Sequence, residues 1–368
     1  MTFSALTLSV LDLIPVRTGQ TSAHAFAASI ALAQRADELG YERYWVAEHH
    51  NMPSVASTNP PVLVGILAAK TKRIRVGSGG VMLPNHSPLV IAEQFGILEA
   101  AFPGRIDVGL GRAPGSDQVI SALLRSSGAV SDVDAFSRNI ADIEALLNPA
   151  GASFTLSSGQ NYDVRATPNA ASEPMVWLLG SSEYSANLAA QRGMPYVFAN
   201  HFSQGSTTQA LDIYRTTFVP SETLADPRTL LTVNLSVANT REEAYALALP
   251  QLQQMARLQT GQKLGPLSTV EEAAATTMAP VQQDLIERMA AKWIIDDPAT
   301  AATRLRQMAA RFGVTEVMVS LVASAYASTA IGETPDRIRA LELLAAEIIT
   351  PTPITASASV SRDSLSAL

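Results

Sequence analysis

Eight short apolar segments alternate with Ala- and Leu-rich segments along the chain, and this alternation restricts the possible folds most strongly. We expect strands at 6–13, 43–48, 73–83, 105–110, 175–179, 195–200, 230–238 and 315–322. We expect helices at 22–39, 60–70, 88–101, 132–147, 183–192, 205–217, 240–258 and 334–347. Near-continuous apolar strands are typical of parallel sheets that are buried on both faces. The series therefore predicts an α/β fold, a closed (β/α)8 TIM barrel, with an open doubly wound sheet as the alternative.

Residues 1–349 are expected to form one barrel domain, because barrels with insertions reach this length as single units. The segment 148–174 is rich in Gly, Ser, Asn and Pro, and the segment 259–300 mixes short helical pieces with loops. We interpret them as insertions after the fourth and seventh strands; the first has room for a small hairpin, and the second is a candidate lid. The Ser-, Ala- and Pro-rich segment 350–368 is expected to be a flexible tail.

The composition argues against several classes of protein. No apolar stretch approaches 18 residues, so we expect no membrane span. The first residues, MTFSALTLSVLDL, lack the basic region of a signal peptide and predict a first strand instead. The chain has no cysteine, which excludes disulfides and Cys-ligated metal centres and fits a cytoplasmic location. The net charge of −7 argues against nucleic acid as a partner.

Unusual residues follow several of the predicted strands, and the active sites of parallel barrels form at the carboxyl ends of their strands. The second strand runs into Glu48-His49-His50, although the chain has only five histidines. The third carries Gly77-Ser78-Gly79-Gly80, the fourth runs into Arg112, and the sixth ends in Asn200-His201. Each feature alone has a structural explanation, since a glycine in a strand often marks a kink. Their convergence at one end of the barrel favours a functional site.

The turn after the fifth strand predicts an anion site. Gly180-Ser181-Ser182 follows the apolar run MVWLL and opens a helix, and Ser185 lies one turn further along. Free backbone N–H groups and the positive end of the helix dipole favour a phosphate there, although helix capping alone would also explain the serines. Arg112 and Arg138 could add charge-assisted hydrogen bonds to the same anion.

Two long stretches of the sequence resemble one family. The segment YWVAEHHNMPSVASTNPPVLVGILAAKTKRIRVGSGGVMLPNHSPLVIAEQFGILEAAFPGRIDVGLGRAPGSD is similar to the N-terminal half of the bacterial luciferase-like flavin-dependent monooxygenases. The segment WLLGSSEYSANLAAQRGMPYVFANHF is similar to the second half. The resemblance extends from residue 6 to about 348 and is strongest to the single-component branch of uncharacterised oxidoreductases.

The resemblance implies an enzyme that uses reduced FMN and O2 to oxidise a small organic substrate. It implies an active-site base at His49 and a non-prolyl cis peptide beneath the flavin ring at Gly79-Gly80. The positions that match phosphate-binding residues, or belong to the same turn, are Arg112, Arg138, Gly180, Ser181, Ser182 and Ser185. It also implies a homodimer and reduced flavin supplied by a separate NAD(P)H:flavin reductase. No G-x-G-x-x-G fingerprint of nicotinamide binding follows a strand, which also favours an external source.

Several alternatives stay open from the sequence. Relatives on the same fold use the deazaflavin F420, and a non-catalytic FMN-binding paralogue would carry a similar site. Metal-dependent hydrolysis with Glu48, His49, His50 and His201 as ligands is a further hypothesis. We expect no metal, because adjacent side chains of a strand face opposite ways. In the flavin hypothesis, Glu48 or His50 would fix the tautomer of His49. The segments 148–174 and 259–300 resemble the family least, so the substrate and light emission do not follow from the resemblance.

Overall fold

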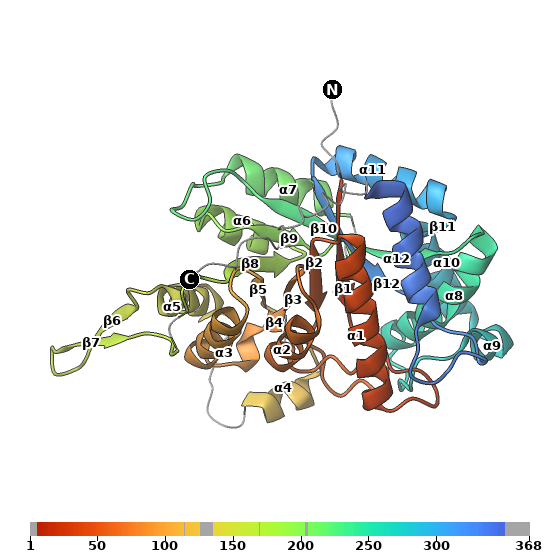
Figure 1. Cartoon of the computed structure of the whole chain (residues 1–368), viewed down its shortest axis with the longest axis horizontal. Helices are drawn as coiled ribbons and strands as arrows, with labels where there is room; N and C mark the ends of the chain where they lie inside the picture. Colours follow the sequence, from red (N-terminus) through yellow and green to blue (C-terminus); the bar gives the residue numbers. More distant parts are fainter. Residues whose placement is uncertain (1–5, 114, 126–134, 169, 203–204, 350–368) are drawn as a thin grey trace, which may run out of the picture.

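A closed barrel of eight parallel strands forms the centre of the protein, and helices surround it (Figure 1). The computed structural model describes residues 6–113, 115–125, 135–168, 170–202 and 205–349. The strands follow one another around the barrel as β1 (Thr7–Asp12), β2 (Arg43–Val46), β3 (Arg75–Ser78), β5 (Ile106–Gly111), β8 (Met175–Gly180), β9 (Tyr196–Phe198), β10 (Thr229–Val237) and β12 (Glu316–Leu321). Pairing of β1 with β12, from Thr7 opposite Glu316 to Leu11 opposite Ser320, closes the ring. The predicted (β/α)8 barrel is confirmed.

The third predicted strand, 73–83, is not continuous, and its prediction as one strand was wrong. β3 ends at Ser78, and the chain resumes pairing as β4 (Val81–Met82), where Val81 lies opposite Leu110 of β5. The peptide between Gly79 and Gly80 is cis, as the resemblance implied. A Cβ atom on Gly80 would lie 2.7 Å from the carbonyl oxygen of Gly109, so the backbones approach too closely for any side chain there.

The eight predicted helices correspond to α1 (Ser22–Leu39), α2 (Pro60–Lys70), α3 (Pro88–Ala101), α5 (Phe136–Leu147), α6 (Glu183–Gln191), α7 (Thr207–Thr216), α8 (Arg241–Gln259) and α12 (Pro335–Ile348). Residues 132–134 of the fourth predicted helix and the predicted tail 350–368 lie outside the described residues. Two helices, α4 (Gln118–Arg125) and α11 (Pro298–Phe312), were missed. The signals of α11 were present in the sequence: Asp297 caps it by accepting from the N–H of Thr300, and Gly313 ends it in a left-handed conformation.

The two segments that break the alternation add elements outside the ring. In 148–174, β6 (Ala152–Thr155) and β7 (Asn161–Val164) form an antiparallel hairpin that stands away from the body of the protein (Figure 1). In 259–300, α9 (Val270–Ala275) and α10 (Pro280–Lys292) precede β11 (Ile294–Asp296), which pairs with β10. The remaining elements are α4 (Gln118–Arg125) and the 3-10 turns η1 (Leu83–Asn85) and η3 (Asn200–Phe202). None of the described helices combines the length and apolar character needed to cross a membrane.

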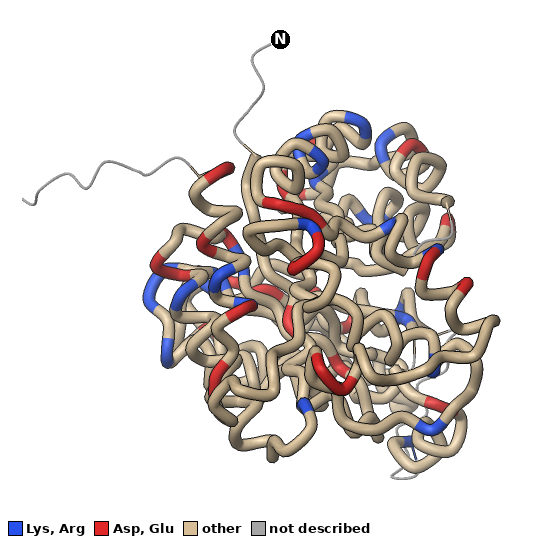
Figure 2. The backbone as a smooth tube through the Cα atoms, turned by 90° about the vertical axis from the view of Figure 1, so that its right-hand side faces the viewer, with Lys and Arg blue, Asp and Glu red and all other residues tan. Residues whose placement is uncertain are grey.

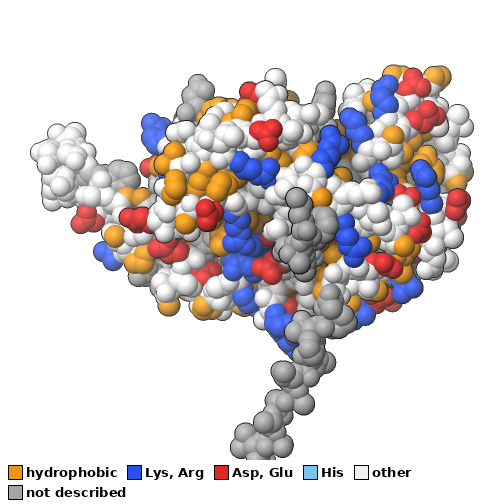
Figure 3. All heavy atoms as spheres, turned by 90° about the horizontal axis from the view of Figure 1, so that it is seen from above, with side chains coloured by type: hydrophobic (Ala, Val, Ile, Leu, Met, Phe, Trp, Pro, Cys, Tyr) orange, Lys and Arg blue, Asp and Glu red, His pale blue; other side chains and the backbone are white. Residues whose placement is uncertain are grey.

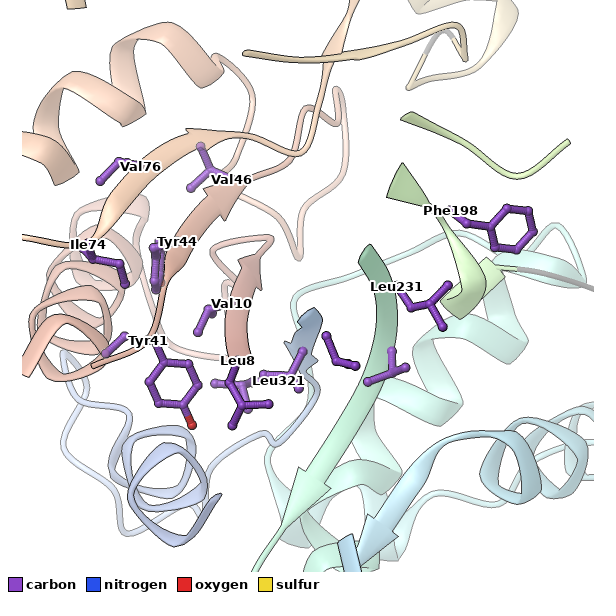
Figure 4. Packing of buried hydrophobic residues seen from close by; sticks show 14 of the residues in the cluster. Leu8, Val10, Tyr41, Tyr44, Val46, Ile74, Val76, Phe198, Leu231 and Leu321 are labelled. Carbon is purple, nitrogen blue, oxygen red and sulfur yellow. The ribbon is translucent and has the colours of Figure 1, made fainter. Parts of the chain in front are cut away.

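The outward faces of the strands form the main hydrophobic core with the surrounding helices. Leu8 and Val10 of β1 lie beside Tyr44 and Val46 of β2 in this core (Figure 4). Outside it, acidic and basic residues are interspersed along the chain (Figure 2), and the face seen from above mixes both signs with apolar patches (Figure 3). The apolar residues of strands and helices thus pack against one another in the core, and most charged residues lie at the surface of the protein.

Inside the barrel, the ends where the strands begin are closed by a buried ion network. Arg43 at the start of β2 lies 2.7 Å from Asp107 and 2.8 Å from Glu316, and Arg75 lies 2.7 Å from Asp107. Trp45 donates its indole N–H to Asp107 at 3.0 Å. These contacts fill the amino-terminal half of the interior, so a ligand cavity is left for the opposite end.

Candidate functional site

A cavity of about 470 Å³ lies at the carboxyl ends of the barrel strands. This volume is in the usual range for small-molecule sites. Most of the wall is apolar, and five different strands contribute Leu11, Trp45, Leu179, Val197 and Met318 to it. The polar side chains on the wall are few and belong to His49, Arg112, Ser181, Ser182, Ser185, His201 and Thr232.

Eight of the nine residues predicted for the site line this cavity. They are His49, Gly79, Gly80, Arg112, Gly180, Ser181, Ser182 and Ser185. Arg138 is the exception, since it lies exposed on α5 and is not among the described residues of the wall. The turns after β2, β3, β5 and β8 therefore meet around one space, as the convergence of their sequence features suggested.

The first turn of α6 forms one end of the cavity. Ser185 donates a hydrogen bond from its Oγ to the carbonyl oxygen of Ser182 at 2.7 Å and lies 3.0 Å from the hydroxyl of Tyr196. A Cβ atom on Gly180 would lie 2.1 Å from this Oγ, so only glycine allows the strand and helix to approach. A capping box between Ser182 and Ser185 uses part of the helix start, and Glu183 places an acidic residue in the first turn. The remaining N–H groups of the first turn and the helix dipole make this end attractive to an anion.

Arg112 adds a full positive charge to the same end. Its guanidinium carbon lies 4.3 Å from the ring centroid of Tyr184, the second residue of α6, in a cation–π contact. No described carboxylate forms an ion pair with Arg112. The guanidinium therefore lies beside the start of α6 with its charge free to meet an anion from the cavity.

Glu48 is a fully buried carboxylate that joins two segments behind the cavity wall. Its Oε1 accepts hydrogen bonds from Nε2 of His50 and Nε2 of His86, both at 2.8 Å, and its Oε2 accepts from the N–H of Met82 at 2.8 Å. Burial raises the pKa of Glu48, but the hydrogen bonds from the two histidines outweigh it and hold the pKa at about 2. The carboxylate thus ties the segment after β2 to β4 and η1, next to Met82 of the cavity wall.

The ring of His49 faces the cavity and forms no hydrogen bond with Glu48 or His50 in the described structure, so the expectation that one of them fixes its tautomer was wrong. The carboxylate of Glu48 is used by His50 and His86. The ring of His49 lines the cavity, and its Nδ1 is buried without a hydrogen-bond partner among the described residues. Burial lowers the pKa of His49, against the opposing charge of Glu48, so the ring is neutral at pH 7 and can accept a proton.

His201 is a second imidazole on the cavity wall, which the sequence indicated as a strand-end residue and as a ligand in the metal hypothesis. It lies in η3, and its Nδ1 contacts the hydroxyl of Thr232. Burial, together with the smaller effect of nearby His49, lowers the pKa of His201 to about 3. Among the described residues, no three His, Cys, Asp or Glu side chains are arranged to hold a metal ion.

The hydrogen bonds of Glu48 predict a specific loss of stability in acid. Because the pKa of Glu48 is about 2 in the folded state against 4.5 ordinarily, its contribution is complete above pH 4.5 and is lost as the pH falls toward 2. Between pH 5 and pH 3 this amounts to about 2 kcal/mol. Urea unfolding at the two pH values should therefore show the wild type losing about 2 kcal/mol more than Glu48→Gln.

Glu38→Gln is the matched control, because Glu38 is an exposed carboxylate on α1. It is expected to keep the pH dependence of the wild type. Equal pH dependence in the wild type and in Glu48→Gln would contradict the assignment.

Comparison with known proteins reveals similarity over most of the chain. The family model described as luciferase-like monooxygenase matches residues 6–316. A luciferase-like monooxygenase of Escherichia coli (strain K12) is 40% identical over 323 residues, which cover 87% of this chain and 92% of that protein. The uncharacterized protein YvbT of Bacillus subtilis (strain 168) is 40% identical over 338 residues, covering 92% and 95%.

Solved structures agree with the sequence matches. The crystal structure of apo-MsnO8 superposes with a TM-score of 0.81 at 34% identity and covers 95% of this chain and 99% of that one. The oxygenating constituent of 3,6-diketocamphane monooxygenase from Pseudomonas putida, in complex with FMN, has a TM-score of 0.66 at 16% identity, covering 94% and 98%. An F420-dependent secondary alcohol dehydrogenase has a TM-score of 0.64 at 12% identity, with the same coverage. The last two support the fold only. From its sequence and its barrel, the chain belongs to the luciferase-like monooxygenase family and is a monooxygenase.

Proposed function

We propose that this monooxygenase uses reduced FMN and O2 to oxidise a small organic substrate. The observation that carries the proposal is the position of Arg112 over the first turn of α6, inside a cavity that is otherwise mainly apolar. Such a cavity suits a ligand with an anionic end and a large apolar ring. FMN has this form, and the FMN complex of the 3,6-diketocamphane enzyme shares the fold.

The residues of the cavity fit FMN at both ends. Arg112, Ser182 and the N–H groups at the start of α6 would hold the phosphate. The apolar wall and the backbone of Gly79 and Gly80 would face the ring. The buried Nδ1 of His49, which no described group pairs, supplies a polar contact that a protein side chain does not fill. Reduced FMN, when bound, supplies the two electrons with which O2 is activated.

His49 and the apolar wall have separate tasks in this proposal. The wall, with Trp45, Leu179 and Met318, excludes water from the reacting groups. Since burial lowers the pKa of His49, its ring is neutral at pH 7 and can accept a proton from a group in the cavity. His201 is neutral as well, so the described wall near both rings carries no charge that would draw water in.

The enzyme's partners follow from the same proposal. We infer that a separate NAD(P)H:flavin reductase supplies the reduced FMN. We also infer a cytoplasmic location, because NAD(P)H is available to such a reductase there. We also infer a homodimer. Apolar side chains are exposed along the neighbouring helices α2 and α3, namely Val62, Ile66, Leu89, Val90 and Ile97. An apolar surface of this kind on a folded protein is typical of a protein–protein interface.

We propose FMN rather than F420 as the cofactor. Titration of the protein with each compound, in oxidised and in reduced form, separates the two hypotheses.

Within the FMN hypothesis, Arg112→Gln tests the phosphate contact. Loss of one charge-assisted contact is expected to weaken FMN binding about 10- to 100-fold. Riboflavin, which has no phosphate, should bind both proteins equally well.

Arg138→Gln is the control for this experiment, because Arg138 is an exposed arginine on α5. It is expected to bind FMN like the wild type. If Arg112→Gln weakens FMN and riboflavin equally, the phosphate does not lie at α6; if F420 alone binds, the choice of cofactor is wrong.

The role of His49 predicts a pH dependence. Because burial lowers the pKa of His49 from 6.5, the wild-type rate of reoxidation of bound reduced FMN should be constant above pH 6.5 and change only below it. His49→Gln should lack this change. Stopped-flow absorbance between pH 5 and 8 measures both, with His24→Gln on α1 as the control. Identical pH profiles for the wild type and His49→Gln would remove His49 from the mechanism.

The inferred homodimer predicts a particle of twice the 38.9 kDa of one chain in light scattering. The double variant Val62→Lys with Ile97→Lys should yield the mass of one chain, because two charges would have to be buried in the interface. Val281→Lys, at an equally exposed position on α10, should remain dimeric. A wild-type mass of 38.9 kDa would refute the homodimer.

A further inference from the structure

A second, much smaller cavity lies outside the barrel, between the segment after β1 and the start of α12. Its volume is about 30 Å³. Arg17, Gln20, Ser324, Thr334 and Arg337 contribute polar groups to its lining. One buried water needs roughly 10–15 Å³ on this measure, so the cavity has room for about two water-sized atoms. None of these residues lines the larger cavity.

Arg17 is a buried cation without a described counter-charge. The side chain is only 7% exposed. Its Nη2 donates to the carbonyl oxygens of Thr329 and Ala330, at 3.0 and 2.7 Å, and its buried Nε has no partner among the described residues. No described carboxylate lies within ion-pair distance of it. Buried charges are normally paired, so this arrangement calls for an anion.

Arg337 brings a second guanidinium to the same cavity. It is 3% exposed, and its Nη2 lies 2.6 Å from Oδ1 of Asp12, while its buried Nε has no described partner. Asp12 also accepts hydrogen bonds from the hydroxyls of Ser29 and Tyr44, both at 2.5 Å. The carboxylate of Asp12 therefore neutralises Arg337. The charge of Arg17 has no described carboxylate to neutralise it.

The start of α12 contributes partial positive charge, which an acidic residue in its first turn opposes. Thr334 precedes this 14-residue helix, and its side chain makes no capping hydrogen bond, so the first N–H groups and the helix dipole lie beside the two arginines. Asp336 lies in the first turn, and burial raises its pKa. Glu333 also lines the cavity, from an exposed position.

We propose that this cavity binds a small monovalent inorganic anion of the size of chloride. Water would fill the space but would not neutralise Arg17. The bound anion would hold together the segment after β1, the carbonyl groups at 329–330 and the start of α12. Leu13, four residues before Arg17, lines the larger cavity, so the anion would support one part of its wall.

Thermal unfolding in chloride and in gluconate, at constant ionic strength, tests the proposal. Gluconate is too large for a cavity of about 30 Å³. Replacing gluconate by chloride should raise the Tm of the wild type saturably, by about 2 °C. Arg17→Gln should lose this response, whereas Arg288→Gln, an exposed arginine on α10, should keep it. An equal Tm of the wild type in the two salts would overturn the proposal.

Two further measurements keep the proposal testable if Arg17→Gln does not fold. A crystal of the wild-type chain grown with bromide should contain an anomalous peak between Arg17 and Arg337, and a cavity without the peak would overturn the proposal. Glu333→Gln removes the carboxylate found among the described lining residues, so chloride should act at lower concentration. If Glu333 itself neutralised Arg17, this variant would gain a chloride response that the wild type lacks, which would also contradict the proposal.

Discussion

Closure of the parallel sheet by the pairing of β1 with β12 is the constraint on which the rest of the structure depends. It brings the carboxyl ends of eight strands to one rim, so His49 and Ser182 line the same cavity although more than a hundred residues separate them. The buried ion network of Arg43, Asp107 and Glu316 fills the other end of the barrel. The cavity therefore lies where the turns are free to carry chemistry.

The electrostatic character of the cavity follows from how the charges around it are paired. Arg112 and the start of α6 make one end positive. The imidazoles of His49 and His201 are neutral, because burial lowers both pKa values. The charge of Glu48 lies behind the wall, where hydrogen bonds from His50 and His86 satisfy it. The result is an apolar space with a single positive end, which is the basis of the proposed FMN site.

Much of this site could be predicted because it depends on local rules. Alternation beyond the end of β2 predicts that Trp45, Ala47 and His49 face the interior together, and all three line the cavity. Contacts between distant segments could not be predicted in this way. The bond between Glu48 and His86 spans 38 residues, and the exposure of Arg138 depends on how α5 packs. The break of the third strand depends on the close approach of Gly109 to Gly80.

The central claim is that one cavity holds FMN with its phosphate at the start of α6. A crystal structure of the wild-type chain with FMN tests it most directly. The account predicts phosphate oxygens within hydrogen-bond distance of the N–H groups at the start of α6 and of the guanidinium of Arg112. A phosphate that binds elsewhere, or an FMN ring outside the wall formed by Trp45 and Met318, would contradict it.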